Sequence, residues 1–274
     1  VISIDMQTKR NVTPRIISIA NQKGGVGKTT TTVNLATSLA AVGKRTLIID
    51  LDPQGNASTG LGVEHAQREN GAYELLFDEC SVSEAAHKTK VPKLDIITST
   101  VDLAGAEIEL INAEKRESRL KQALMNSDTD YDYILFDCPP SLNLLTLNAL
   151  VASHGIIVPL QCEFYALEGI SHLVKTVERV KNAFNPDLEL QGIVLTMYDK
   201  RNNLSHQVEN DVRDHFGDKV YYTVIPRNVR VSEAPSYGLP AIVYDMNCSG
   251  SQAYLRLAKE LLKREKKRIE SEAA

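Results

Sequence analysis

The segment over residues 16–42 constrains the fold more than any other part of the chain. An apolar run, residues 16–20, leads into Gln22-Lys23-Gly24-Gly25-Val26-Gly27-Lys28-Thr29-Thr30, and an Ala- and Leu-rich stretch over residues 28–42 follows at once. Strand, glycine-rich loop and helix in this order form a phosphate loop, because the glycines let backbone N–H groups and a helix N-terminus converge on one anion. The segment therefore predicts an α/β fold built around a P-loop.

Two side chains of the loop have predicted roles in holding a nucleoside triphosphate. Lys28 is placed to neutralise the β- and γ-phosphates, and the hydroxyl of Thr29 is placed to ligate Mg²⁺. The strict pattern has glycine where this chain has Gln22, so the loop is a variant. An ordinary glycine-rich turn is the alternative, and the strand and helix on either side argue against it. We expect ATP to be bound by Gly24, Gly25, Val26, Gly27, Lys28, Thr29 and Thr30.

Short β-branched runs alternate with longer helical stretches along the rest of the chain. This alternation predicts a doubly wound, mostly parallel sheet flanked by helices. A chain of 274 residues, 43% of them hydrophobic, has enough apolar material for one such domain, which we expect over residues 15–274 after a flexible tail at residues 1–14. Expected strands cover residues 16–20, 46–50, 94–98, 133–137, 155–159, 190–196 and 222–225, and expected helices cover residues 28–42, 108–126, 141–152, 166–184, 204–216 and 251–267.

Two of the expected strands end in a carboxylate. Asp50 closes residues 46–50 and Asp137 closes residues 133–137. Open α/β sheets bind ligands at the carboxyl ends of their strands, so both acids are candidates for the Mg²⁺ site with Thr29, partly through water. Capping of the next helix is the alternative for each. Asp52 follows in a loop that is able to approach the γ-phosphate.

Charge and cysteine content limit the classes of function. A net charge of −4 argues against a protein that coats nucleic acid with its whole surface, so any DNA contact must be a local basic patch. The four cysteines and six histidines lack metal-ligand spacing, and reduced thiols in a cytoplasmic protein are the simplest interpretation. The longest apolar runs are strand-sized, so no membrane partner is expected.

Four motifs together resemble one family. Lys23 stands just before the glycines of the loop, as in the deviant Walker A ATPases. The further motifs are Asp50-Leu51-Asp52-Pro53-Gln54-Gly55-Asn56, Asp137-Cys138-Pro139-Pro140-Ser141 and Pro226-Arg227-Asn228-Val229-Arg230-Val231-Ser232-Glu233-Ala234-Pro235-Ser236. With them the chain resembles the ParA/Soj chromosome and plasmid partitioning ATPases over roughly residues 15–263.

The resemblance implies a cycle of assembly and hydrolysis. ParA-like proteins with ATP bound form a sandwich homodimer, in which the lysine at the position of Lys23 reaches the phosphates held by the other subunit. The dimer binds double-stranded DNA without sequence preference, which places such proteins on the nucleoid, and a ParB partner stimulates an otherwise weak hydrolysis. Asp52 matches the family position needed for hydrolysis, and we expect it to orient the attacking water.

The resemblance also implies DNA-binding and adenine-binding positions. The DNA-binding positions fall on Arg201 and Arg230, each of which lies among mixed charges and is otherwise an ordinary solvated arginine. The basic run at residues 259–268 is a further candidate, with a solvated helix end as the alternative. Met197 and the Pro226-Arg227 backbone are expected near adenine, with a core position as the alternative for Met197.

Related folds offer three other functions. A MinD-like positioning ATPase needs a terminal amphipathic membrane helix with bulky apolar anchors, and the sequence after Leu262 has only Ile269. A nitrogenase-reductase-like electron carrier needs cysteines that bridge a cluster, and only Cys138 lies near the expected site. A dethiobiotin-synthetase-like enzyme needs neither Lys23 nor the two arginines. The sequence leaves open whether a chromosome or a plasmid is the cargo.

Overall fold

The sheet forms the centre of the molecule. The computed structural model describes residues 13–127, 129–163 and 165–272, and within them seven strands form one sheet in the order β3-β4-β2-β5-β1-β6-β7. All neighbouring pairs are parallel except β3 with β4. The strands are β1 (Arg15–Ile19), β2 (Thr46–Asp50), β3 (Ala86–Lys88), β4 (Leu94–Ile97), β5 (Tyr133–Asp137), β6 (Gly155–Gln161) and β7 (Glu189–Thr196).

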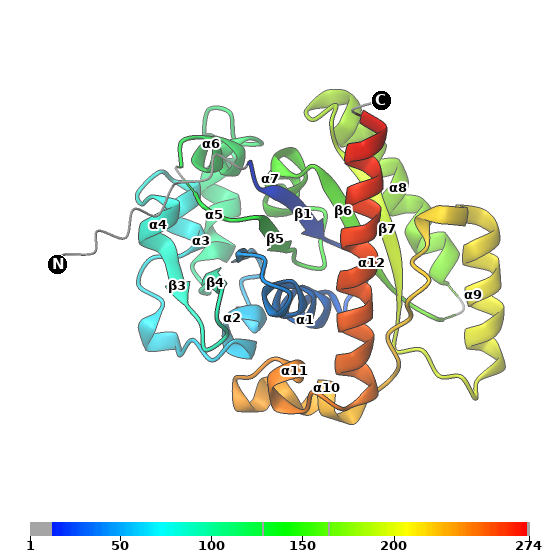
Figure 1. Cartoon of the computed structure of the whole chain (residues 1–274). Helices are drawn as coiled ribbons and strands as arrows, with labels where there is room; N and C mark the ends of the chain where they lie inside the picture. The colour runs from blue at the N-terminus through cyan, green and yellow to red at the C-terminus, as the bar shows by residue number, and fades with distance from the viewer. Residues whose placement is uncertain (1–12, 128, 164, 273–274) are drawn as a thin grey trace.

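Helices cover both faces of this sheet, as the doubly wound prediction requires. Side chains alternate along β1, so that Ile17 and Ile19 pack into the core under α1 and α12 while Ile16 packs into the core under α7 and α8. Figure 1 shows α1 and α12 together in front of the strands. The helices are α1 (Lys28–Ala41), α2 (Asn56–Gly60), α3 (Ala72–Leu76), α4 (Val82–Ala85), α5 (Leu103–Leu110), α6 (Arg119–Met125), α7 (Leu144–Ala152), α8 (Ala166–Ala183), α9 (Asn203–Phe216), α10 (Val229–Glu233), α11 (Ala241–Tyr244) and α12 (Ser249–Glu272).

The strand expected over residues 222–225 is wrong. This segment follows the edge of β7 with isolated bonds only, from Tyr221 N to the Ile193 carbonyl and from Ile225 N to the Leu195 carbonyl, both 2.8–2.9 Å. The intervening N–H groups of Tyr222 and Thr223 donate instead to the carboxylate of Glu260 on α12, at 2.8 and 2.9 Å. The Glu260 side chain therefore takes the place of the backbone hydrogen bonds that would have made this segment a strand.

The helix expected over residues 108–126 is also wrong, because the structure has two helices there. α5 ends at Leu110 and α6 begins at Arg119, and Lys115 between them has φ +52°, a left-handed value that no α-helix contains. The Arg116 guanidinium donates to the Ile111 carbonyl at 2.8 Å and closes the turn. The antiparallel edge strand β3 was missed because it has three residues.

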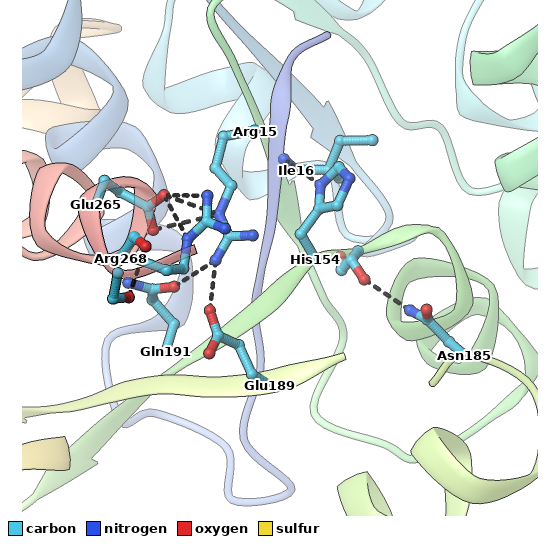
Figure 2. Close-up of polar contacts among 10 residues, drawn as sticks. Arg15, Ile16, His154, Asn185, Glu189, Gln191, Glu265 and Arg268 are labelled. Atoms are coloured by element: carbon cyan, nitrogen blue, oxygen red, sulfur yellow. Dashed lines mark hydrogen bonds and ion pairs between the residues drawn. The ribbon is translucent and has the colours of Figure 1, made fainter. Parts of the chain in front are cut away.

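A polar cluster ties the start of β1 to the end of α12. The Arg15 guanidinium lies 2.6 Å from the carboxylate of Glu189 on β7, 2.8 Å from the Gln191 amide oxygen and 3.2 Å from the carboxylate of Glu265 on α12 (Figure 2). Arg268 also contacts Glu265, at 3.1 Å. These contacts fix α12 across the sheet, and α12 in turn packs against α1, the helix that follows the P-loop.

The topology places the P-loop at the centre of one edge. β1 lies between β5 and β6, and the chain turns to one side of it for β2 to β5 and to the other for β6 and β7. Such a reversal leaves a crevice beyond the carboxyl ends of the central strands, where ligands bind in open α/β sheets. The expected tail falls mostly on residues 1–12, which lie outside the described residues. Within the described part of the chain, no helix is long and apolar enough to span a membrane.

Candidate nucleotide-binding site

Two glycines give the loop between β1 and α1 its shape. Gly25 and Gly27 have φ +73° and +86°, values that side chains with a Cβ adopt only with strain, and Gly27 is the N-cap of α1. The Asn21 side chain accepts from Lys23 N at 3.0 Å, and the Thr196 hydroxyl donates to the Val26 carbonyl at 2.8 Å. The loop is therefore held open at the N-terminus of a long helix, which is a geometry suited to phosphate.

A cleft of about 350 Å³ opens over this loop. Its lining combines regions that are far apart in sequence, namely the P-loop, the segments after β2, β5 and β7, and Tyr254 of α12. Most of the residues predicted to bind nucleotide line it: Gly24, Gly25, Gly27, Lys28, Thr29, Thr30, Asp52, Met197, Pro226 and Arg227. Val26 is buried instead, with its carbonyl on Thr196. The cleft is large enough for the phosphates and base of one nucleotide.

Lys28 is held near the phosphate position by its own loop. Its ammonium donates to the Lys23 carbonyl at 2.9 Å, and the side chain is 7% exposed. Burial lowers the pKa of Lys28, and the nearby carboxylate of Asp137 opposes that change. An anion arriving in the cleft would give this ammonium the charge partner that burial denies it.

The two acidic strand ends lie side by side. Asp50 and Asp137 are register partners on β2 and β5, and both are fully buried. The pKa of Asp137 is raised, first by burial and second by the charge of Asp50, while the hydroxyls of Thr29 and Thr32 oppose the rise. Burial likewise raises the pKa of Asp50. Burial and mutual repulsion therefore disfavour two negative charges at this position, and a cation bound nearby would offset that cost.

The two acids differ in how their oxygens are satisfied. Asp50 accepts three hydrogen bonds, from Ser58 N at 2.9 Å, the Ser58 hydroxyl at 2.7 Å and Asp52 N at 3.2 Å. Asp137 accepts from the Thr32 hydroxyl at 2.9 Å through Oδ1, whereas its buried Oδ2 has no hydrogen-bond partner among the described residues. An orphaned carboxylate oxygen beside a P-loop threonine fits a Mg²⁺ ion or one of its waters.

Asp52 is placed in the loop after β2. It lines the cleft, and its Oδ1 accepts from Gln54 N at 3.0 Å. Gly55, with φ +61°, turns the chain back into α2, which carries Ser58 to Asp50. The loop is therefore braced at both ends, by Gln54 N on Asp52 and by Ser58 on Asp50.

Besides the buried Val26, Asp50 and Asp137, three predicted residues with exposed side chains lie outside the cleft lining of this chain, namely Lys23, Arg201 and Arg230. The Lys23 ammonium is 2.5 Å from the carboxylate of Glu163, in the segment after β6, and its side chain is 50% exposed. Arg201 pairs with Asp199 at 3.1 Å, and Arg230 pairs with Glu233 at 3.2 Å. Arg201 and Arg230 are 89% and 55% exposed, so both guanidiniums face solvent, and Arg230 also lies 3.8 Å from the carboxylate of Asp245.

Several residues of the cleft were missed by sequence reasoning. Thr196 ends β7, Asn56 begins α2, and Tyr254 reaches the cleft from α12. Asn56 ends the motif over residues 50–56 but had no predicted role, whereas Thr196 and Tyr254 belong to none of the motifs, and folding brings all three to the P-loop. Met197 has φ +49°, a left-handed value that a residue other than glycine adopts at some cost. This backbone strain marks the cleft, and it is visible only in the structure.

Comparison with known proteins extends over nearly the whole chain. The sequence model of a family described as an AAA domain matches residues 14–190. The chromosome partitioning protein ParA of Caulobacter vibrioides is 59% identical over 256 residues, which are 93% of this chain and 96% of that protein. The sporulation initiation inhibitor protein Soj of Bacillus subtilis is 56% identical over 247 residues, 90% of this chain and 98% of that protein. A solved cobyrinic acid a,c-diamide synthase from Mycobacterium smegmatis, with ADP and magnesium bound, superposes with a TM-score of 0.81 at 37% identity and covers 93% of this chain and 96% of its own.

Proposed function

The chain belongs to the ParA/Soj family of partitioning ATPases, and on that premise we propose that its ATP cycle controls reversible, sequence-independent binding to DNA. ATP bound in the cleft joins two copies of the chain into a dimer that binds double-stranded DNA. Hydrolysis, stimulated by a ParB-like centromere-binding protein, separates the dimer and releases the DNA. Such a cycle positions a chromosome or plasmid on the nucleoid.

One observation carries the nucleotide part of the proposal. The orphaned Oδ2 of Asp137 lies near a P-loop whose Lys28 ammonium has, among the residues that the structure describes, only the Lys23 carbonyl as hydrogen-bond partner. Together they offer an anion site and a cation site next to each other, which is what a Mg²⁺-bound triphosphate requires. Thr29 and Asp137 would hold Mg²⁺, with Asp50 behind them as a second charge, and the ion would neutralise charge on the phosphates. A similar protein with ADP and magnesium bound supports the same pair of cofactors.

The chain's own residues then supply positioning and charge. Lys28 neutralises the terminal phosphates, and the N–H groups of the loop and of the start of α1 hold their oxygens. Asp52 lines the cleft on a braced loop, where its free oxygen orients a water molecule for attack on the γ-phosphate. No side chain forms a covalent intermediate, so the rate depends on how well these groups are placed.

The position of Lys23 supports a site completed by a second subunit. Its side chain is half exposed and paired with Glu163 rather than directed into the cleft of its own chain. An exposed ion pair of this kind contributes at most about 1 kcal/mol, so exchange of Glu163 for a triphosphate costs little. Lys23 is therefore able to leave Glu163 and contact the phosphates of a partner copy, so that dimerisation depends on bound ATP.

Arg201 and Arg230 provide the DNA contacts of the proposal. Their guanidiniums are solvent-exposed, and each is paired with a carboxylate that phosphate oxygens are able to replace. A two-fold dimer doubles both positions, so a weakly basic surface on one chain becomes a larger one on two. DNA affinity thereby depends on dimerisation and hence on ATP.

The hydrolysis step is tested by Asp52→Ala. This variant should bind ATP like the wild type, hydrolyse it about 100-fold more slowly because the water is no longer oriented, and stay on DNA after ATP is added. Phosphate release and DNA retention are measured on the same samples, with Asp102→Ala, in an exposed turn before α5, as the control. Normal turnover by Asp52→Ala would move the water-orienting role to another residue.

A further inference from the structure

Arg68 is a buried cation that none of the roles proposed above uses. It is 9% exposed, and the four hydrogen bonds that its guanidinium makes to the described residues all end on neutral oxygens. Neutral acceptors replace only part of the hydration that a buried charge gives up, so this arrangement costs stability. The role of Arg68 therefore depends on which segments those oxygens belong to.

One branch of these contacts leads to the loop that carries Asp52. Nη2 of Arg68 donates to the Thr59 hydroxyl at 2.9 Å, and that hydroxyl donates to the Gly55 carbonyl at 3.1 Å. The N–H of Gly55 donates in turn to the Asp52 carbonyl at 2.8 Å. Three hydrogen bonds in series thus connect the guanidinium to the backbone of Asp52.

Gly55 also packs directly against the guanidinium. A Cβ at this position would collide with Nη1 of Arg68 and with the Ser99 carbonyl. The same Nη1 donates to that Ser99 carbonyl at 3.1 Å. The turn that follows Asp52 is therefore closed against a surface made by the guanidinium and one of its acceptors.

A second branch fixes α2 and the segment that follows it. Nε and Nη2 of the guanidinium lie 3.2 and 2.9 Å from the Val63 carbonyl, beyond the end of α2. The N–H of Ser99 donates to the Ser58 hydroxyl at 3.1 Å, and that hydroxyl donates to Asp50 at 2.7 Å. Residues 55–63 are thus held to β2 through Asp50 and to the segment after β4 through Ser99.

The guanidinium shape is required for these contacts to be made together. Its N–H groups diverge in one plane and reach Val63, Thr59 and Ser99 at once, whereas a lysine ammonium is a single compact donor group. Burial lowers the pKa of Arg68, and the charge of Asp50 opposes that change. An arginine nevertheless stays protonated in proteins, so the contacts are permanent.

We propose that Arg68 is a positioning residue for ATP hydrolysis, whose guanidinium holds residues 52–63 in the conformation that keeps Asp52 at the cleft. This inference rests on the proposed role of Asp52 and adds to it a residue that does not line the cleft. Because Arg68 contacts the Asp52 loop and not the P-loop, it governs the rate of hydrolysis and leaves nucleotide affinity unchanged.

Arg68→Lys tests the geometry of these contacts, because it keeps the charge and removes the planar group. Single-turnover hydrolysis of ATP should slow about tenfold, since a small displacement of a positioned group has a large effect on rate. Affinity for ADP with Mg²⁺, measured by calorimetry, should match that of the wild type. Arg116→Lys is the control, because its guanidinium also donates to a backbone carbonyl, that of Ile111, and does not line the cleft.

A double variant distinguishes positioning from general support of the fold. Arg68→Lys should slow the wild type but should not slow Asp52→Ala further, because no carboxylate is left there to be misplaced. Slowing of both backgrounds by the same factor would overturn the proposal and leave Arg68 as a structural residue.

Amide hydrogen exchange follows the loop itself and needs no hydrolysis. Residues 55–63 should exchange faster in Arg68→Lys than in the wild type, while α1 is unchanged and Arg116→Lys matches the wild type in both segments. Wild-type exchange over residues 55–63 in Arg68→Lys would show that the guanidinium does not hold the loop.

The outcomes separate this inference from the role of Asp52. If Arg68→Lys exchanges faster over the loop and hydrolyses ATP slowly while Asp52→Ala turns over normally, Arg68 positions the loop and the water-orienting role of Asp52 is wrong. If Asp52→Ala is slow and Arg68→Lys hydrolyses ATP at the wild-type rate, the inference is overturned and the role of Asp52 stands.

Discussion

At the scale of single residues, the P-loop lysine carries the nucleotide site. Lys28→Ala removes a buried ammonium whose pKa burial has already lowered and which would gain two charge-assisted bonds from phosphate. Two such bonds correspond to about a 100-fold loss of ATP affinity. Titration calorimetry measures it, with the exposed Lys90→Ala as control. Retained tight binding in Lys28→Ala would mean that the cleft holds a different ligand.

His154 gives a pH dependence of stability that is separate from the site. Burial, followed by the charges of Arg15 and Arg268, lowers its pKa, and its Nδ1 accepts from Ile16 N at 3.0 Å, which requires an unprotonated nitrogen. The unfolded chain therefore binds more protons than the folded one below the ordinary histidine pKa of about 6.5, and the free energy of unfolding falls as the pH is lowered through that window. Urea unfolding at pH 5 and pH 7.5 should show a smaller difference for His154→Gln. An equal difference would assign the effect to other groups.

At the scale of elements, the polar cluster of Arg15, Glu265 and Arg268 holds β1 to α12, and we expect it to support the site because α12 packs against α1. Glu265 is 6% exposed and faces both Arg15 and Arg268, so Glu265→Gln leaves two guanidiniums against a neutral amide and should cost about 2 kcal/mol of unfolding free energy. Glu270→Gln is the matched control on the same helix, because its pair with Lys266 spans 3.8 Å and is exposed. Chemical denaturation measures the unfolding free energy of both variants. Equal losses would show that the contacts of Glu265 stabilise the fold no more than the exposed ion pair of Glu270.

The elements also show what sequence patterns predict and where they stop. The buried strands were predictable because a continuous apolar run such as β6 is typical of a strand that helices cover on both faces of a parallel sheet. Residues 222–225 have the same pattern, yet Glu260 of α12 takes their N–H groups, and no local pattern contains that information. Likewise the P-loop and the acidic strand ends were visible in sequence, whereas Thr196, Asn56 and Tyr254 come to the cleft from separate elements.

At the scale of the whole molecule, the parts of the proposed cycle lie on different surfaces of one chain. The cleft opens over the loop after β1, the half-exposed Lys23 pairs with Glu163 rather than lining the cleft, and Arg201 and Arg230 are exposed. Residues 226–231 link two of these parts, because Pro226 and Arg227 line the cleft while Arg230 faces solvent on α10. Nucleotide and DNA are therefore expected to act on each other through short segments of backbone and through dimerisation.

The exposed arginines predict a uniform electrostatic effect. Arg230→Ala should weaken binding to all DNA sequences alike and reduce the steepness of its salt dependence, because phosphate contacts release counterions and carry no base information. Affinity measured over a series of salt concentrations gives the slope, and light scattering with ATP reports dimerisation. Loss of the dimer in this variant would instead make Arg230 an interface residue.

The central claim is that ATP switches this protein onto DNA. Co-sedimentation of the wild-type chain with unrelated duplexes at moderate salt, with ATP and Mg²⁺, with ADP and Mg²⁺ and without nucleotide, tests it most directly. We expect binding with ATP and Mg²⁺ but neither with ADP nor without nucleotide, and equal binding to every duplex. Absence of binding in all three states would contradict the DNA role while leaving the ATPase site intact, and would favour a small-molecule synthetase built on the same fold.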